Sequence, residues 1–272
     1  MTHYLHNTRL RIEKFVYEKG TNVALYHAEH SKEYQAIQKD IKRGLMNQID
    51  SIANYKDVLP LLVSMAKSVT GGPLFDQVSV LLAKVPLNDD VDFAAYLVWA
   101  GSQGGQAAMD KLGISGIFGL KNDALITYFN DYSRLVINSV DNYTKQWIAT
   151  KIQDGKIAGL TPFEIQQSLM EDGEAMSAIR AERIVLTETA QAMKVIENEA
   201  ARRYGITEMI WRTSRDERVC PICLPLEGKI KPMGKTYPDG FDGPPGHVSC
   251  RCYEEEVIPT DWVIPEKIWL GE

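Results

Sequence analysis

The chain has 272 residues and a mass of 30.6 kDa, enough for one large domain or two modest ones. Its composition, 44% hydrophobic and 24% charged, is that of an ordinary globular protein and excludes a fibre or a disordered tail as a description of the whole chain. The formal net charge is −6, and the last twenty residues, with six acids and one lysine, account for −5 of it. The remaining near-neutral body argues against a protein that wraps nucleic acid with its whole surface.

No segment for export or membrane insertion is expected from the distribution of apolar residues. The first eleven residues are polar, with two histidines and two arginines, and lack the apolar stretch of a signal peptide. The most apolar short run, residues 93–100, has eight residues, whereas a membrane-spanning helix needs about twenty. We therefore expect a protein that is made in the cytoplasm of its host cell and does not enter a membrane.

The N-terminal part of the chain has the residue spacing of amphipathic helices. Apolar residues recur at steps of three and four from Tyr34 to Ile52, which predicts one helix. Similar patterns predict shorter helices at about 56–69, 73–85 and 90–100, each broken by glycine or proline. These helices are expected to share one apolar core.

Residues 101–122 differ from their surroundings because six glycines alternate there with apolar residues. The stretch lacks the Gly-Lys-Ser/Thr sequence of a phosphate-binding loop and does not follow a predicted strand. We interpret it as a flexible connector.

The clearest helical pattern begins at Leu125. Aromatic and aliphatic residues follow at steps of three and four as far as Trp147, and we interpret this stripe as facing the core. Gly155 and Gly159 are expected to end the helix.

The next helical region has a distinct start and a distinct end. Thr161, Pro162 and Glu164 have the pattern of a capping box at a helix start. A long helix is then predicted from about 174 to 204, with Gly205 as its end. Its nearly balanced charges are interpreted as a solvated, ion-paired face rather than a nucleic-acid-binding stripe. The residues of this face are Arg180, Arg183, Arg202 and Arg203, alternating with Glu182, Glu197 and Glu199.

After residue 205 the pattern changes from helices to strands and turns. Residues 209–213 are a plausible short strand, and residues 253–258 a closing strand. Between them, residues 224–246 contain five prolines and five glycines and are therefore expected to be rich in turns.

All four cysteines lie within 33 residues near the C-terminus, a clustering that suggests a metal site rather than disulfides. Cys220 and Cys223 have the two-residue spacer that lets two thiolates reach one zinc ion, and His247 and Cys250 repeat that spacing. These four side chains would close a tetrahedron, as in a structural zinc site. Cys252 is a spare that could replace Cys250 or His247 as the fourth ligand.

The sequence also allows other interpretations of this cluster. The cysteines could form disulfides once the protein leaves the reducing cytoplasm, or a dithiol redox pair, although no thioredoxin-like pattern surrounds them. Arg-Asp before Cys-x-x-Cys and a later histidine is also similar to the start of HNH-type nucleases. His247 is the only histidine beyond residue 30, so it cannot both bind zinc and act as general base. A Ser/His/Asp triad cannot be assembled around this single histidine either, and we therefore expect that the protein is not an enzyme.

Several segments together resemble the C-terminal domain of tailed-phage minor head, or head-morphogenesis, proteins, the phage Mu F-like family. The segments are AERIVLTET at 181–189, WRTSRDERVCPIC at 211–223, LEG at 226–228 and PPGHVSCRC at 244–252. The resemblance covers roughly residues 125–258 and leaves the first 120 residues without a matching motif. Within it, Glu188 is expected to cap or to pair with Arg212 or Arg215.

The resemblance implies a structural component of the virion. Members of the family look like minor capsid proteins that assemble inside the head near the portal vertex, and some are similar to proteins ejected with DNA. The implied partners are the portal protein, the major capsid or scaffold proteins and phage DNA during packaging or ejection. An HNH-like metal-dependent nuclease and a DNA-binding module are the alternatives.

These observations lead to one expected architecture. A mainly α-helical N-terminal docking domain (1–120) is followed by a small α+β domain (121–258) with a Cys/His zinc knuckle, and by an acidic C-terminal tail (259–272).

Overall fold

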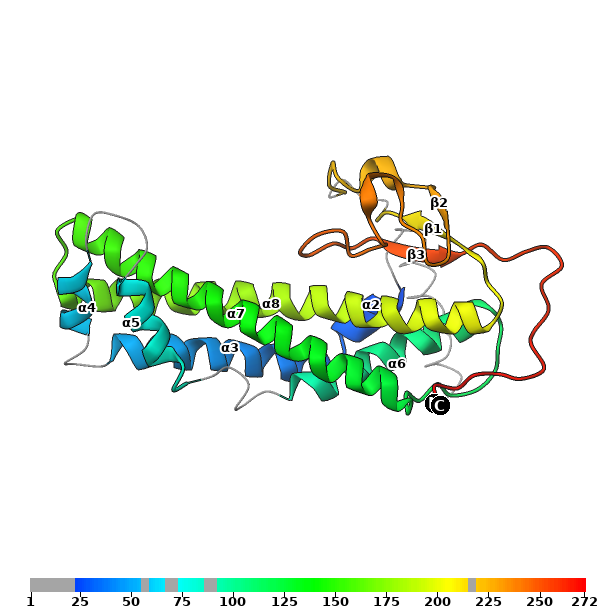
Figure 1. Cartoon of the computed structure of the whole chain (residues 1–272), viewed down its shortest axis with the longest axis horizontal. Helices are drawn as coiled ribbons and strands as arrows, with labels where there is room; N and C mark the ends of the chain where they lie inside the picture. Colours follow the sequence, from blue (N-terminus) through cyan, green and yellow to red (C-terminus); the bar gives the residue numbers. More distant parts are fainter. Residues whose placement is uncertain (1–22, 55–58, 67–72, 86–91, 215–218) are drawn as a thin grey trace, which may run out of the picture. The chain divides into compact units, whose positions relative to one another are not determined.

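The computed structural model describes residues 23–54, 59–66, 73–85, 92–214 and 219–272. Over these residues the expected fold class is confirmed, since helices precede a small antiparallel sheet (Figure 1). The helices are α2 (Val23–Glu29), α3 (Lys32–Ala53), α4 (Leu59–Met65), α5 (Pro73–Leu82), α6 (Phe93–Lys111), α7 (Asp123–Ile157) and α8 (Pro162–Arg203). The strands are β1 (Glu208–Arg212), β2 (Ile230–Pro232) and β3 (Tyr253–Glu256). None of these helices combines the length and apolar character that crossing a membrane requires.

The chain packs as two compact units, neither of which is one continuous stretch. Among the described residues, unit 1 comprises 23–35, 95–129, 183–214 and 219–272, and unit 2 comprises 36–54, 59–66, 73–85, 92–94 and 130–182. Each of α3, α6, α7 and α8 therefore contributes residues to both units. The expected division at residues 120 and 258 follows sequence motifs rather than packing, and it stays a prediction.

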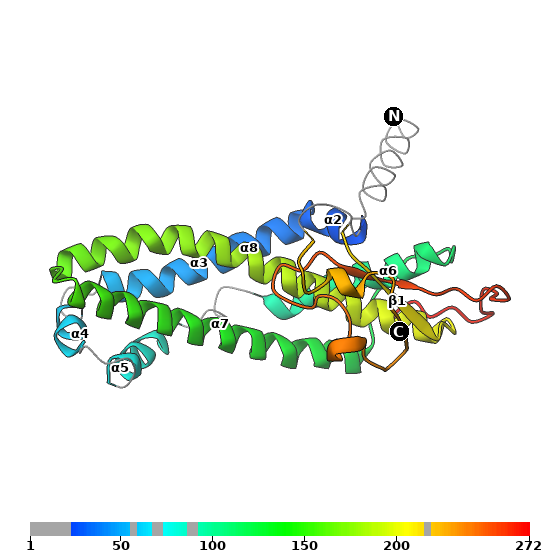
Figure 2. The same ribbon diagram turned by 90° about the horizontal axis from the view of Figure 1, so that it is seen from above.

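Unit 2 is a helical bundle with its own apolar core. The parts of α3, α7 and α8 that belong to it run side by side, and α4 and α5 lie at one end of them (Figures 1 and 2). The core contains Ile49, Leu62, Val78, Ile148 and Leu169, all buried. The apolar stripe predicted along residues 34–52 is confirmed, because every aliphatic residue of that stripe is buried.

The aromatic stripe predicted along α7 faces the core only in part. Phe129 and Val140 are buried, but Tyr143 is 53% exposed and lies under the guanidinium of Arg180, 4.2 Å from the ring centre. The first residues of α7 belong to unit 1 and the rest to unit 2. Gly159, with a positive φ of 77°, follows the helix end, whereas Gly155 lies inside α7 against Ile165.

The capping box at Thr161 is confirmed. The Thr161 N–H donates to Glu164 Oε2 at 2.7 Å, and the Glu164 N–H donates to Thr161 Oγ1 at 3.3 Å. The helix that starts there is longer than expected, because α8 continues for 42 residues to Arg203 without a break near residue 174. Gly205, with a φ of 82°, ends it as predicted.

The interpretation of residues 101–122 as a flexible connector is wrong for its first half. Residues 101–111 belong to α6, and their glycines allow close contact inside unit 1. A Cβ at Gly104 would lie 2.2 Å from the carbonyl oxygen of Met193 in α8, and one at Gly105 would lie 2.3 Å from the ring of Phe118. Glycine is thus required here by helix packing, and only residues 112–122 connect α6 to α7.

The sheet has the strand order β2-β1-β3, with both pairs antiparallel. The predicted strands at 209–213 and 253–258 are confirmed as β1 and β3, each within two residues. The acidic residues near the C-terminus are not all solvated, because Glu254 and Glu256 on β3 are buried. Beyond β3 the chain returns to the α6–α7 connection, where the Gly119 N–H donates to the Leu270 carbonyl at 3.0 Å.

Candidate metal centre

Two short turns, each closed by a backbone hydrogen bond between its first and fourth residues, carry four of the five predicted ligands. In the first, the Cys223 N–H donates to the Cys220 carbonyl oxygen at 3.2 Å and lies 3.3 Å from the Cys220 sulfur. In the second, the Cys250 N–H donates to the His247 carbonyl oxygen at 3.1 Å. Each turn therefore presents its first and last side chains together, as the two-residue spacing predicts.

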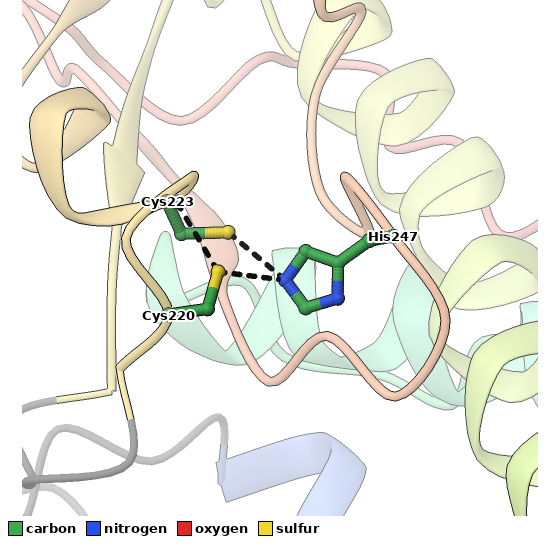
Figure 3. A group of neighbouring side chains, drawn as sticks. All are labelled: Cys220, Cys223 and His247. Carbon is green, nitrogen blue, oxygen red and sulfur yellow. Dashed lines mark hydrogen bonds between the residues drawn. The ribbon is translucent and has the colours of Figure 1, made fainter.

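The two turns face each other. His247 Nε2 lies 3.0 Å from the Cys220 sulfur and 3.3 Å from the Cys223 sulfur, and the three side chains point toward one another in Figure 3. The Cys223 and Cys250 sulfurs are 3.8 Å apart. Ligands of one tetrahedral zinc ion lie about 3.5–3.8 Å from each other, so these separations are within about half an ångström of such a site.

The orientation of His247 suits a metal ligand. Its Nδ1 lies 2.8 Å from the Val248 carbonyl oxygen. Because a carbonyl oxygen only accepts hydrogen bonds, Nδ1 carries the hydrogen. In the neutral ring, Nε2 then has a free lone pair, which is directed toward the Cys220 and Cys223 sulfurs. A backbone contact of this kind fixes the ring of many metal-binding histidines.

Cys252 also reaches the cluster, although it lies outside both turns. The donor atoms form two groups of three, each within 4.8 Å, namely Cys220, Cys223 and His247, and Cys223, Cys250 and Cys252. Cys223 belongs to both groups and is buried, as are Cys250 and Cys252. The structure thus brings all five predicted residues together, and which four of them bind a metal stays a prediction.

The cluster rests on a small apolar core. Trp211 of β1 is fully buried and meets the ring of Tyr237 edge to face at 5.2 Å, with Leu226 and Phe241 beside them. A small cavity beside the donors is lined by Ser214, Val219, Ser249 and Arg251. Little apolar surface is buried around the turns, so a metal cross-link would add considerably to their stability.

The thiols differ in how readily they ionise. Burial raises the pKa of Cys223 to about 12. A hydrogen bond from Cys252 lowers the pKa of Cys250 to about 5 against the effect of burial, and the same bond raises the pKa of Cys252. Cys250 is therefore a thiolate at neutral pH even without a metal, and a thiolate is the form that binds one.

No disulfide joins the cysteines of this cluster, all four of which lie among the described residues. The Cys223 and Cys250 sulfurs are 3.8 Å apart, well beyond the roughly 2.05 Å of a disulfide bond. The donor set of thiols and one imidazole could hold a metal ion.

Sequence reasoning did not identify Thr187 as part of this site. Its hydroxyl accepts the N–H of Ser249 at 3.0 Å, so α8 holds the second turn at a residue whose φ is 59°. The signal was present in the segment 181–189, but spacing alone could not reveal its partner 62 residues later. Arg212, expected as a partner of Glu188, pairs with Glu227 and Glu255, and Arg215 lies outside the described residues.

A comparison with protein families locates this site in a known domain. Residues 146–254 match the model of the family described as "Phage Mu protein F like protein". The searches of curated proteins and of solved structures gave no match. The matched range includes Thr187, both cysteine-bearing turns, β1, β2 and the first half of β3. Over residues 146–254 the chain is therefore similar to the phage Mu protein F-like family.

Proposed function

We propose that this protein is a head-morphogenesis protein of a tailed phage, a minor capsid component inside the head near the portal vertex. The observation that carries the proposal is the family match over residues 146–254, which covers the end of α7, all of α8 and the Cys/His site. The chain is made in the host cytoplasm and then incorporated into the assembling head. Its role there is structural rather than catalytic.

The Cys/His site is proposed to bind one zinc ion through Cys220, Cys223, His247 and Cys250. Paired turns, sulfur-rich donors and an imidazole with its Nε2 toward the sulfurs are typical of a closed structural site. Zinc would supply a cross-link between the two turns and no open coordination position. Its binding in such knuckles is worth on the order of 10 kcal/mol.

The proposed partners are the portal protein, the major capsid or scaffold proteins, and phage DNA during packaging or ejection. Exposed apolar side chains support an assembly role, because Ile157 and Phe163 are each more than 60% exposed at the turn between α7 and α8. Leu160 in the same turn is also exposed. Apolar side chains grouped in this way are common at protein interaction sites.

Co-expression with the head proteins of the phage that encodes the chain tests this proposal. We expect the chain to sediment with procapsids that contain the portal and to be lost from procapsids without it. Cys220→Ser is expected to reduce incorporation, whereas Ile222→Ser, an exposed change inside the same turn, should leave it intact. Equal recovery with and without procapsids would contradict the proposal.

The nuclease alternative makes a separate prediction. Its general base would have to be His247, whose Nε2 is directed at two sulfurs. We therefore expect purified, metal-loaded protein to leave plasmid DNA uncut in the presence of Mg²⁺. Cleavage that is lost in His247→Ala would favour the nuclease instead.

A further inference from the structure

A cluster of buried charges lies between the sheet and the helices of unit 1. Glu254 and Glu256 of β3, 2% and 6% exposed, occupy positions where an antiparallel sheet normally places apolar side chains. Glu197 of α8, also 6% exposed, joins them. Lys111 at the end of α6 and Lys231 of β2 supply the positive charges. None of these residues takes part in the metal centre.

One half of the cluster is well paired. Glu254 Oε1 lies 3.3 Å from the Lys231 ammonium and accepts the hydroxyl of Tyr237 at 3.0 Å. Its Oε2 accepts the side-chain amide of Asn198 at 2.9 Å. Lys231 also donates to the carbonyl oxygen of Asp242.

The other half is short of positive charge. Lys111 forms an ion pair with Glu197 and lies 3.4 Å from Glu256 Oε2, so that one ammonium serves two carboxyl groups. Neither oxygen of Glu256 accepts a hydrogen bond, although both are buried. Lys194, the next cation on α8, is turned to the exposed carboxylate of Asp242 at 2.9 Å.

The charges that face Glu197 come from three elements. Lys111 belongs to α6, and Glu256 and Glu254 belong to β3. Lys231 of β2 forms an ion pair with Glu254. With every group ionised, three buried carboxylates would face two ammonium groups, of which Lys231 is buried and Lys111 is 33% exposed. One buried negative charge would remain uncompensated, which is costly, whereas one added proton makes the cluster neutral.

We propose that Glu197 holds a proton near neutral pH, and that the cluster acts as a proton-dependent latch holding the sheet against α6 and α8. The packing of the sheet on α6 and α8 is most stable when the proton is present. Raising the pH removes the proton, leaves an uncompensated buried charge and loosens the sheet on its helices.

The pKa of Glu197 supports this geometry. Burial raises it from 4.5 to about 7, against the effect of Lys111 and with a further contribution from Glu256 and Glu254. A carboxyl group whose pKa is higher in the folded than in the unfolded chain stabilises the folded state. This stabilisation is complete at pH values below the pKa of the unfolded chain. The stabilisation is then lost as the pH rises from about 4.5 through about 7.

Denaturant unfolding of the full chain at pH 6 and pH 8 tests the proposal. From these pKa values, the contribution of Glu197 to the folding equilibrium constant should fall about tenfold between the two pH values. Glu197→Gln mimics the protonated group, so this contribution should disappear and the variant should gain stability at pH 8. The control Glu199→Gln, two residues further along α8 and paired with Arg202 and Arg203, should keep the wild-type pH dependence.

The metal centre does not obscure this comparison. Protons compete with a metal for thiolates, so metal binding makes stability rise with pH, which is opposite in sign. That effect is common to wild type and Glu197→Gln and cancels in their difference. An equal pH dependence in both proteins would overturn the proposal.

A second measurement does not depend on the variant folding. In wild-type protein with ¹³C-labelled glutamate carboxyls, we expect one carboxyl resonance to titrate near neutral pH. If every glutamate titrates below about pH 5, the ordinary range for exposed carboxyls, the latch does not exist.

Discussion

The hydroxyl of Thr187 is a small group with a large positional role. It accepts a hydrogen bond from the Ser249 N–H, in a turn that also holds His247 and Cys250. A side chain of α8 therefore anchors that turn to the helix. Neighbouring Thr189 serves a different purpose, since it is buried and bonded to the hydroxyl of Tyr96. The two threonines on either side of Glu188 thus attach α8 to the metal centre and to α6.

Removing this hydroxyl should weaken the second turn. Thr187→Val keeps the shape but leaves the Ser249 N–H without its acceptor, which should cost about 1 kcal/mol of unfolding free energy. Thr187→Ser retains the hydroxyl and is the control. Chemical denaturation measures both, and equal stability of Thr187→Val and wild type would show that the bond contributes nothing.

The ligand set can be resolved one cysteine at a time. Cys250→Ser should abolish the binding of one zinc per chain, because Cys250 ends a turn and is already a thiolate at neutral pH. Cys252→Ser should retain the zinc with an affinity about 10- to 100-fold lower, the usual effect of losing a hydrogen-bonding partner behind a ligand. Elemental analysis and competition with a chromophoric chelator measure the two variants. Loss of zinc in Cys252→Ser together with retention in Cys250→Ser would reverse the assignment.

At the scale of helices and strands, local signals predicted ends better than lengths. The capping box at Thr161 and the stop at Gly205 depend on residues within a few positions, and both were predictable. The continuity of α8 through Gly173 was not, because it depends on contact with Ile49 of α3. The same holds for Gly104, whose partner Met193 lies far along the chain. The burial of Glu197 was missed because its partner Lys111 is equally remote.

The contact between α6 and α8 predicts a strong effect at Gly104. An added methyl group would collide with the Met193 carbonyl, a backbone atom that cannot move aside, and overpacking costs about 1–3 kcal/mol. Alanine regains at most about 1 kcal/mol of helix propensity, so Gly104→Ala should be destabilised overall. Gly119→Ala, where the new methyl group meets nothing within 4 Å, is the matched control. Thermal unfolding of both variants decides whether the close approach exists.

At the scale of the whole molecule, the bundle of unit 2 and the metal centre of unit 1 rest on different sources of stability. Unit 2 has a continuous aliphatic core that includes Ile49 and Ile148. In unit 1 the metal centre is supported by a much smaller group around Trp211, together with buried charges. The five donors could be predicted from spacing, whereas this uneven distribution of apolar residues emerges only when the chain is folded.

Removal of the metal should therefore unfold one part of the chain before the other. After chelation we expect faster amide hydrogen exchange in β1, β2, β3 and both cysteine-bearing turns. Without the metal, no cross-link holds the two turns together. Amides in the core of unit 2 should keep their protection, since this core and the proposed ligands belong to different units. Cys220→Ser in the absence of chelator should give the same exchange pattern as chelated wild type. Uniform loss of protection along the chain would instead mean that both units fold as one cooperative body.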